Sequence, residues 1–283
     1  MDSVLVLIAA PGSGAISDQI ASRLGNVHWL AKGEALETAA SHVTLAREIC
    51  SGKPIDINVV PSDNRRKRVL LADMDSTMIQ QECIDELGVV AGVGDHIKSV
   101  TARAMRGEID FEGALKERVA LLQGLPESVI QDVINKRITF MPGGKTLLAT
   151  MKKHGAYTAL VSGGFTAFTS HVALALGFDE NRANTLLVKN GQLTGKVALP
   201  ILGKEAKVES LQRICSVHGL SRDDVLAVGD GANDIPMIQA AGLGVALHAK
   251  PKVQEQAQYV VNHSDLTALL YLQGYTNAEF ISA

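Results

Sequence analysis

The hydrophobic and polar positions of the chain alternate in regular blocks from residue 69 onward. Short apolar runs that predict buried strands occupy residues 69–72, 157–161, 225–228, 244–247 and 259–261. Segments that predict helices follow them at residues 143–154, 165–176, 204–218 and 234–241. Because strands and helices alternate, we expect an α/β fold with a doubly wound parallel sheet.

One stretch of the chain interrupts this alternation. Roughly eighty residues separate the first two core strands, far more than a β–α connection needs, which predicts an inserted helical subdomain at about residues 82–140. Its clearest helix spans residues 110–124 and carries an apolar stripe of Phe111, Leu115, Val119 and Leu122. Farther along, residues 185–189 and 193–199 flank Asn190-Gly191 and predict a β-hairpin.

The first 63 residues predict a separate, small α+β module. Expected strands occupy residues 4–9, 27–30 and 55–60, and expected helices occupy residues 15–24 and 35–50. A basic segment, residues 64–68, then precedes a second domain at residues 69–283. With a net charge of −3, a solvated linker is favoured there over a nucleic-acid patch.

The composition is that of an ordinary globular protein, with 46% hydrophobic and 20% charged residues. The negative net charge gives no general attraction to nucleic acid. The three cysteines form no Cys-x-x-Cys pair, which is typical of reduced thiols in a cytoplasmic protein. Residues 4–10 resemble a signal-peptide core, but Asp2 replaces its basic segment, so we expect a strand. No apolar run approaches the roughly 20 residues that span a bilayer, so no membrane partner is expected.

The first core strand ends abruptly at Asp73, and Asp75 follows two residues later. In an open α/β sheet, ligands bind beyond the carboxyl ends of the strands. Residues i and i+2 of an extended chain point to the same side, so both carboxylates can converge on one volume. That arrangement suits Mg²⁺, or a nucleophile beside a proton shuttle. An Asx-turn that closes the strand is the alternative.

Two further features can be interpreted either as phosphate-binding groups or as ordinary structural features. Ser162-Gly163-Gly164 follows the second core strand, where glycine backbone can approach a phosphate, although an ordinary turn has the same composition. Lys207 lies in the predicted helix at residues 204–218. It is either a surface lysine or an ammonium held against a phosphoryl oxygen.

The third core strand leads into Gly229-Asp230-Gly231-Ala232-Asn233-Asp234. Asp230 can supply a further oxygen to Mg²⁺, and Asp234 can ligate the ion or orient Lys207. A capped loop explains Asn233 or Asp234 separately. It does not explain polar residues suited to phosphate or metal at each of these strand ends.

Arg118 lies inside the apolar stripe of the predicted insert, seven residues after Phe111. A guanidinium that faces a pocket can bind a carboxylate through two parallel hydrogen bonds. A snorkelling arginine with its head in solvent is the alternative.

Taken in order, these motifs resemble those of haloacid-dehalogenase-type phosphohydrolases: Asp73-Met74-Asp75-Ser76-Thr77, Ser162-Gly163-Gly164, Lys207 and residues 229–234. More narrowly, Glu82, Met105-Arg106-Gly107, Phe111 and Arg118 resemble the cap of the phosphoserine phosphatases. The resemblance covers about residues 69–273. The first 63 residues are loosely similar to the ACT-like region of longer bacterial members, with one strand of the ACT pattern missing.

The resemblance implies a role for each core residue. Asp73 would be the nucleophile and Asp75 the general acid and base. Mg²⁺ would bind Asp73, Asp230 and the carbonyl oxygen of Asp75, with Asp234 orienting the groups around it. The resemblance also implies residues that bind phosphate and substrate, namely Ser162, Gly163, Lys207, Glu82, Met105, Phe111, Arg118 and Asn233.

The implied reaction is hydrolysis of O-phospho-L-serine through an aspartyl-phosphate, the last step of serine biosynthesis. In this scheme Arg118 recognises the carboxylate of serine and Glu82 its ammonium. The alternatives are a related phosphatase or phosphotransferase for another small phosphomonoester, and a signalling receiver domain with a phosphorylated aspartate. The expected partner is this small molecule, with no nucleic acid or membrane, and homodimerisation is left open.

Overall fold

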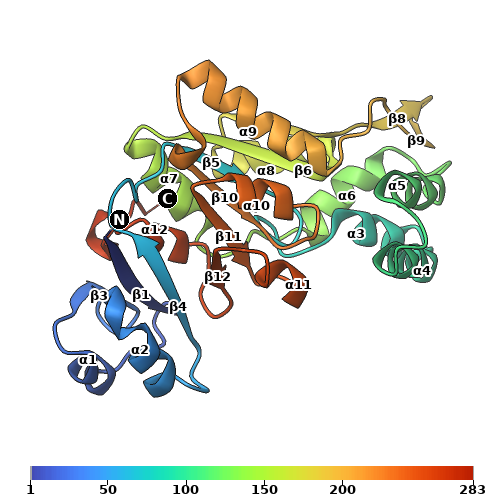
Figure 1. Cartoon of the computed structure of the whole chain (residues 1–283). Coiled ribbons are helices and arrows are strands. Elements are labelled where there is room, and N and C mark those ends of the chain that lie inside the picture. The colour runs from blue at the N-terminus through green and yellow to red at the C-terminus, as the bar shows by residue number, and fades with distance from the viewer. Residues whose placement is uncertain (1, 283) are drawn as a thin grey trace.

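The computed structural model describes residues 2–282 and, within this range, every side chain except that of Met105. A six-stranded sheet forms the centre of the larger domain, and every neighbouring pair of its strands is parallel (Figure 1). In spatial order the strands are β12 (Tyr259–Val261), β11 (Leu243–Leu247), β10 (Val225–Gly229), β5 (Val69–Ala72), β6 (Tyr157–Phe165) and β7 (Glu180–Asn184). The predicted parallel sheet is confirmed, and β7 is an additional edge strand.

Helices cover both faces of this sheet because its strands are apolar on both sides. Val69 and Leu71 of β5 pack in one cluster with α9 (Lys204–His218), α10 (Ile235–Ala240) and α11 (Pro251–Gln254). Leu70 and Ala72 point to the opposite cluster, which includes α7 (Gly144–Lys153), α8 (Thr166–Leu176) and α12 (Ala268–Leu272). The strict alternation along β5 is the two-residue period of a strand buried on both faces.

The predicted helical insert lies between β5 and α7 and extends beyond one end of the sheet (Figure 1). It consists of α3 (Cys83–Val90), α4 (Gly94–Met105), α5 (Phe111–Ala120) and α6 (Ser128–Arg137). Asp110 caps α5 as expected, since its carboxylate accepts the N–H of Gly113 at 2.8 Å. The predicted hairpin is also present, as β8 (Leu186–Lys189) and β9 (Gln192–Val197).

The N-terminal module is a four-stranded antiparallel sheet with two helices, α1 (Asp18–Leu24) and α2 (Val43–Ile49). Its strand order is β2 (His28–Ala31), β3 (Ala35–Ala39), β1 (Ser3–Ala9) and β4 (Ile55–Pro61). The prediction of one helix over residues 35–50 was wrong, because its first five residues form β3 and pair with β1. The module therefore has one strand more than the sequence predicted. Ala, Leu and Glu favour helix locally, and pairing with β1 overrides that preference.

Strand β4 attaches this module to the outer edge of the large sheet. The side chain of Asn58 donates to Val260 O at 2.9 Å and accepts from Val260 N at 3.0 Å, so one amide pairs with β12 as a strand would. The carboxylate of Asp56 accepts the N–H groups of Asn262 and His263 at 2.8 and 3.0 Å. These bonds satisfy backbone groups that an open sheet edge would expose.

The basic segment at residues 64–68 is only partly solvated. Lys67 is buried and donates to the carbonyl oxygens of Asn64 and Asp223 at 2.5 and 2.7 Å. The Arg65 side chain is 12% exposed and pairs with Glu37 at 2.7 Å. The sequence interpretation as a solvated linker therefore holds only in part, because Arg65 and Lys67 fasten the module to the core. Asn64, Arg66 and Arg68 are exposed, and Arg66 also forms an ion pair with Glu279 at 2.7 Å.

Two smaller expectations concern compartment and membrane. The three cysteines are all buried free thiols, as their spacing predicted. Among residues 2–282, no helix has both the length and the apolar character needed to cross a bilayer.

Candidate active site

Three neighbouring strands bring the sequence-predicted residues to one edge of the sheet. Ala72 of β5 is in register with Val228 of β10, and Asp73 N donates to Val228 O at 3.0 Å. Asp73 and Asp230 therefore follow adjacent strands at the same level. Strand β6 lies on the other side of β5, and its Ser162 faces the same pocket.

Asp73, Asp230 and Asp234 form a compact carboxylate group, with one oxygen from each within 4.8 Å of the others. Asp73 and Asp234 are buried, at 5% and 0% exposure. Asp73 Oδ1 has no hydrogen-bond partner among the described residues, although Lys207 Nζ lies 2.7 Å away as an ion-pair partner. Three hard oxygens of like charge in so small a volume suit a divalent cation such as Mg²⁺. The structure thus places Asp234 among the candidate ligands and the Asp75 carboxylate outside them.

Lys207 is buried at 1% exposure between Asp73 and Asp234 and forms an ion pair with each. Burial alone would lower the pKa of this ammonium, but the two carboxylates outweigh it and raise the pKa above its usual value. The interpretation of Lys207 as a surface lysine is therefore wrong. A fixed positive charge at this point can stabilise the oxygens of a bound phosphoryl group.

The remaining carboxyls of the group carry protons more readily than in water. Burial and then the charge of Asp73 raise the pKa of Asp230 to about 7 and the pKa of Asp234 to about 7. This mutual repulsion is the electrostatic reason why a cation would be held tightly here.

Asp75 lies slightly apart, where the helical insert begins. Its Oδ1 accepts the backbone N–H of Cys83, the first residue of α3, at 3.1 Å. Burial, followed by the charge of Glu82, raises the pKa of Asp75 to about 8. A carboxyl group in this state can give a proton to a leaving oxygen near neutral pH.

The two glycines after Ser162 lie close to other groups of the site, with little room for a side chain. A Cβ on Gly164 would lie 2.8 Å from Asp75 Oδ2, and one on Gly163 would lie 3.1 Å from Phe111 Cζ. Gly164 N donates to Ser162 Oγ at 2.9 Å, which sets the direction of the hydroxyl. The loop is a tight backbone wall for a ligand, as the sequence motif suggested.

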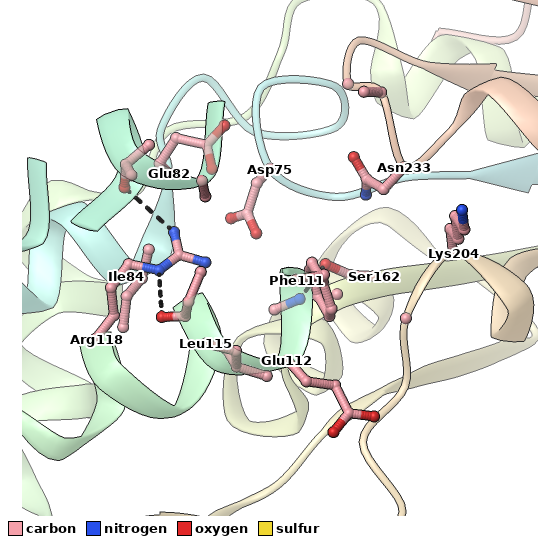
Figure 2. A pocket seen from close by; sticks show the side chains of 18 of the residues that line it. Asp75, Glu82, Ile84, Phe111, Glu112, Leu115, Arg118, Ser162, Lys204 and Asn233 are labelled. Atoms are coloured by element: carbon pink, nitrogen blue, oxygen red, sulfur yellow. Dashed lines mark hydrogen bonds between the residues drawn. The ribbon is translucent and has the colours of Figure 1, made fainter. Parts of the chain in front are cut away.

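Asp73, Asp75, Asp230 and the Ser162 loop line one cavity of about 810 Å³ between the sheet edge and the insert. Lys207 and Asp234 are buried beside Asp73 and do not line it. Figure 2 shows Asp75 pointing into it, with Glu82 and Arg118 on one side and Ser162 and Asn233 on the other. Lys204 lines it as well, at the beginning of α9. The candidate phosphate-binding residues of the sheet edge and the residues of the insert thus line the same pocket.

Arg118 borders this cavity on the insert side and is half-buried. Its Nε donates to Ala114 O at 3.2 Å and its Nη1 to Thr101 Oγ1 at 3.5 Å (Figure 2). Burial lowers the pKa of this guanidinium, and the charges of Asp85 and Glu82 oppose that effect. The side chain is thus held in the pocket by the protein, rather than snorkelling into bulk solvent.

Glu82 lies on the open rim of the pocket, on the same side as Arg118, and accepts the hydroxyl of Ser76 at 2.7 Å. Phe111 also borders the pocket, at 36% exposure, whereas the other members of its stripe are buried. The Met105 side chain, predicted as an apolar wall, lies outside the described part of the structure.

Residues missed by the sequence reasoning include Asp85, Thr101 and Lys250 on the pocket wall, and Asn184 behind it. No sequence pattern marked them.

Comparison with known proteins agrees with this geometry. The family model described as haloacid dehalogenase-like hydrolase matches residues 70–239. Among curated proteins, the chain is 47% identical over 204 residues to a phosphoserine phosphatase of Haemophilus influenzae, covering 72% of this chain and 65% of that protein. It is 46% identical to a phosphoserine phosphatase of Streptococcus thermophilus, covering 71% of this chain and 93% of that one.

A solved structure described as a phospho-aspartyl intermediate analogue of phosphoserine phosphatase superposes with a TM-score of 0.68 and 41% identity. The match covers 73% of this chain and 98% of that structure. The chain spans less than two thirds of the length of the Haemophilus relative but nearly all of the Streptococcus relative and of this structure. The chain therefore belongs to the haloacid dehalogenase-like hydrolases and, within them, to the phosphoserine phosphatase family.

Proposed function

We propose that this chain hydrolyses O-phospho-L-serine to L-serine and phosphate with Mg²⁺ bound at the carboxylate group. One observation carries the proposal. The cavity is lined at the sheet edge by Asp73, whose carboxylate pairs with the buried ammonium of Lys207. On the insert side it is lined by a carboxylate and a guanidinium, Glu82 and Arg118. A phosphorylated amino acid has the three matching charges. The relatives named above support the same substrate.

In the proposed reaction, Asp73 attacks phosphorus in line and the bond from phosphorus to the serine oxygen breaks. The Asp75 carboxyl gives its proton to that oxygen, and serine leaves. Water then attacks the phosphorus of the aspartyl-phosphate, Asp75 takes the proton of this water, and phosphate leaves with the Asp73 carboxylate restored. The close approach of Gly164 to Asp75 Oδ2 brings the acid next to the phosphate loop, as this sequence of steps requires.

Lys207, Ser162 and the Gly163 backbone would hold the phosphoryl oxygens during both steps. Mg²⁺, held by Asp73, Asp230 and Asp234 with the main-chain oxygen of Asp75, would supply positive charge to the same oxygens. The side chains that bind serine itself would be Arg118, Glu82, Phe111, Met105 and Asn233.

The proposal also assigns the parts of the chain. Residues 69–283 would be the phosphatase domain, and the insert at about residues 82–140 would be a cap that covers the substrate. Residues 1–63 would be an ACT-like module joined by the segment at residues 64–68. Because β4 binds the sheet edge at β12, this module would contribute to the stability of the phosphatase domain.

The test is phosphate release from a panel of L-phosphoserine, D-phosphoserine, phosphothreonine, phosphoethanolamine and p-nitrophenyl phosphate with Mg²⁺. We expect many turnovers, fastest with L-phosphoserine. A single phosphoryl group retained per chain would instead identify a signalling receiver. Transfer to an added alcohol in preference to water would identify a phosphotransferase, and no release from phosphoserine would refute the proposal.

A further inference from the structure

Asn184, the last residue of β7, joins two segments that border the pocket and is only 2% exposed. Its Nδ2 donates to Gly163 O at 2.9 Å and to Leu202 O at 3.2 Å, and its Oδ1 accepts from Leu202 N at 2.8 Å. The pattern fixes which end of the amide is the oxygen, because the N–H needs an acceptor and the two carbonyls need a donor. Every polar atom of the side chain thus has a partner.

The bond from Asn184 holds the C=O of Gly163, which belongs to the same peptide unit as the N–H of Gly164. In a trans peptide, the C=O of Gly163 and the N–H of Gly164 point in opposite directions. That N–H donates to Ser162 Oγ at 2.9 Å. Because Ser162 Oγ accepts this hydrogen bond, its own proton is directed toward another acceptor, such as a ligand oxygen in the pocket.

The same peptide lies close to two other groups of the site. Gly164 lies so close to Asp75 that a Cβ would approach the carboxylate to 2.8 Å, and Gly163 lies against the Phe111 ring. A rotation of the peptide would withdraw the Gly164 N–H from Ser162 and move the loop relative to Asp75. Orientation errors of this kind cost rate because phosphoryl transfer depends on positioning.

Asn184 also fixes the segment that leads into α9. Leu202 pairs with the Asn184 amide through both its N–H and its C=O, and α9 begins at Lys204. Lys207 lies in the first turn of that helix and is the buried cation beside Asp73. One side chain therefore ties together the two segments that carry Ser162 and Lys207.

We propose that Asn184 is a positioning residue for phosphoryl transfer, which fixes the Gly163–Gly164 peptide and through it the direction in which Ser162 donates. The inference rests on the proposed function only in that the ligand of the Ser162 loop is a phosphoryl group. It does not depend on which alcohol carries that group.

The test is a double-mutant cycle of Asn184→Ala and Ser162→Ala, with kcat and KM measured on p-nitrophenyl phosphate and Mg²⁺. Removal of the amide should lower kcat by about tenfold to a hundredfold when Ser162 is present, with a smaller change in KM. In the Ser162→Ala background the same change should cost less than about threefold, because the group that Asn184 orients is gone. Asn184→Ala should also raise the inhibition constant for inorganic phosphate more when Ser162 is present than in the Ser162→Ala background.

The matched control is Asn58→Ala. Asn58 is also a buried asparagine, at 6% exposure, that pairs with the backbone through both ends of its amide, and it lies at the N-terminal module. Its replacement should lower the melting temperature without changing kcat. The comparison of Asn58→Ala with Asn184→Ala shows whether a fall in kcat follows from the loss of any buried amide or only from the loss of Asn184.

Equal losses in both backgrounds, or no loss of kcat in Asn184→Ala, would overturn the proposal. If Asn184→Ala does not fold, Asn184→Ser enters the same cycle, since it keeps a small polar group but does not reach both segments. If neither variant folds while Asn58→Ala does, Asn184 serves the fold and the proposal is overturned. Turnover of p-nitrophenyl phosphate without turnover of phosphoserine would refute the proposed substrate and leave this test intact.

Discussion

The sharpest consequence of the pocket is that one arginine should decide whether the enzyme requires a carboxylate on its substrate. Arg118 is half-buried and held by Ala114 O and Thr101 Oγ1, so part of its guanidinium is already occupied by the protein. The remaining N–H donors can bind a carboxylate without further ordering of the side chain. Phosphoserine has this carboxylate and phosphoethanolamine does not.

Removal of Arg118 leaves the carboxylate of bound phosphoserine without its partner. Truncation of one partner of such a pair costs about 2–5 kcal/mol, which is a factor of roughly thirty to several thousand in kcat/KM. The half-exposed position of the side chain places the expected value in the lower part of this range. Phosphoethanolamine should lose less than about threefold, because it never made the contact.

The assay compares kcat/KM for the two compounds in the wild type and in three variants. Arg118→Ala should collapse the preference for phosphoserine. Glu82→Gln should weaken both compounds and leave their ratio nearly unchanged, because both carry the ammonium that Glu82 would bind. Arg103→Ala is the control, since Arg103 is a partly exposed arginine of the same insert, paired with Glu117 at 2.6 Å. Parallel losses on both compounds in Arg118→Ala would show that the arginine serves the phosphate or the fold, and would refute the assignment.

Three further changes test the rest of the site and the fold. Asp73→Asn removes the attacking charge with little change of shape, so turnover and formation of the aspartyl-phosphate should fall to background, and substantial turnover would exclude the covalent mechanism. Exhaustive chelation should abolish activity, Mg²⁺ should restore it, and Ca²⁺ should restore it poorly because it prefers more ligands in a looser geometry; full activity after chelation would contradict the metal site. Asn58→Ala should cost about 1–3 kcal/mol of unfolding free energy through two lost buried hydrogen bonds, seen as a lower melting temperature, and an unchanged melting temperature would show that β4 does not stabilise the sheet edge.

The sequence was sufficient to predict the catalytic residues of the sheet edge, because each buried strand ends visibly where an apolar run meets a polar residue. The apolar run at Val69–Ala72 stops at Asp73, and the run that forms β10 stops at Asp230, so the parallel sheet by itself brings the two carboxylates together. Glycines 163 and 164 were readable for a similar local reason, because close approach to a ligand requires the absence of Cβ. Each of these features depends on a few neighbouring residues.

The failures concern contacts made between distant segments. Residues 35–39 carry good helix formers, and they form β3 only because β1 offers a pairing edge. The sequence left Asp234 open between a metal ligand and a residue that orients Lys207, since a helix start does not reveal how far its carboxylate reaches. Asn184 carried no signal, because its partners are backbone atoms of Gly163 and Leu202, about twenty residues away on either side.

The architecture also separates the chemistry from the recognition of the substrate. Asp73 follows β5, Lys207 lies on α9 and Asp234 caps α10, three elements that pack in one body, and Lys207 pairs with both carboxylates. Arg118 and Glu82 lie on the insert, which meets this body at the pocket and through the backbone bond from Cys83 to Asp75. Further backbone bonds join the insert to the β8–β9 hairpin, among them Gly124 N to Leu193 O at 2.9 Å. A change on the insert should therefore alter which phosphomonoester is preferred while p-nitrophenyl phosphate, which needs only the phosphoryl site, is still hydrolysed. A change on the sheet edge should lower the rate with every substrate by the same factor, and this difference in kinetic pattern follows from where the side chains are anchored.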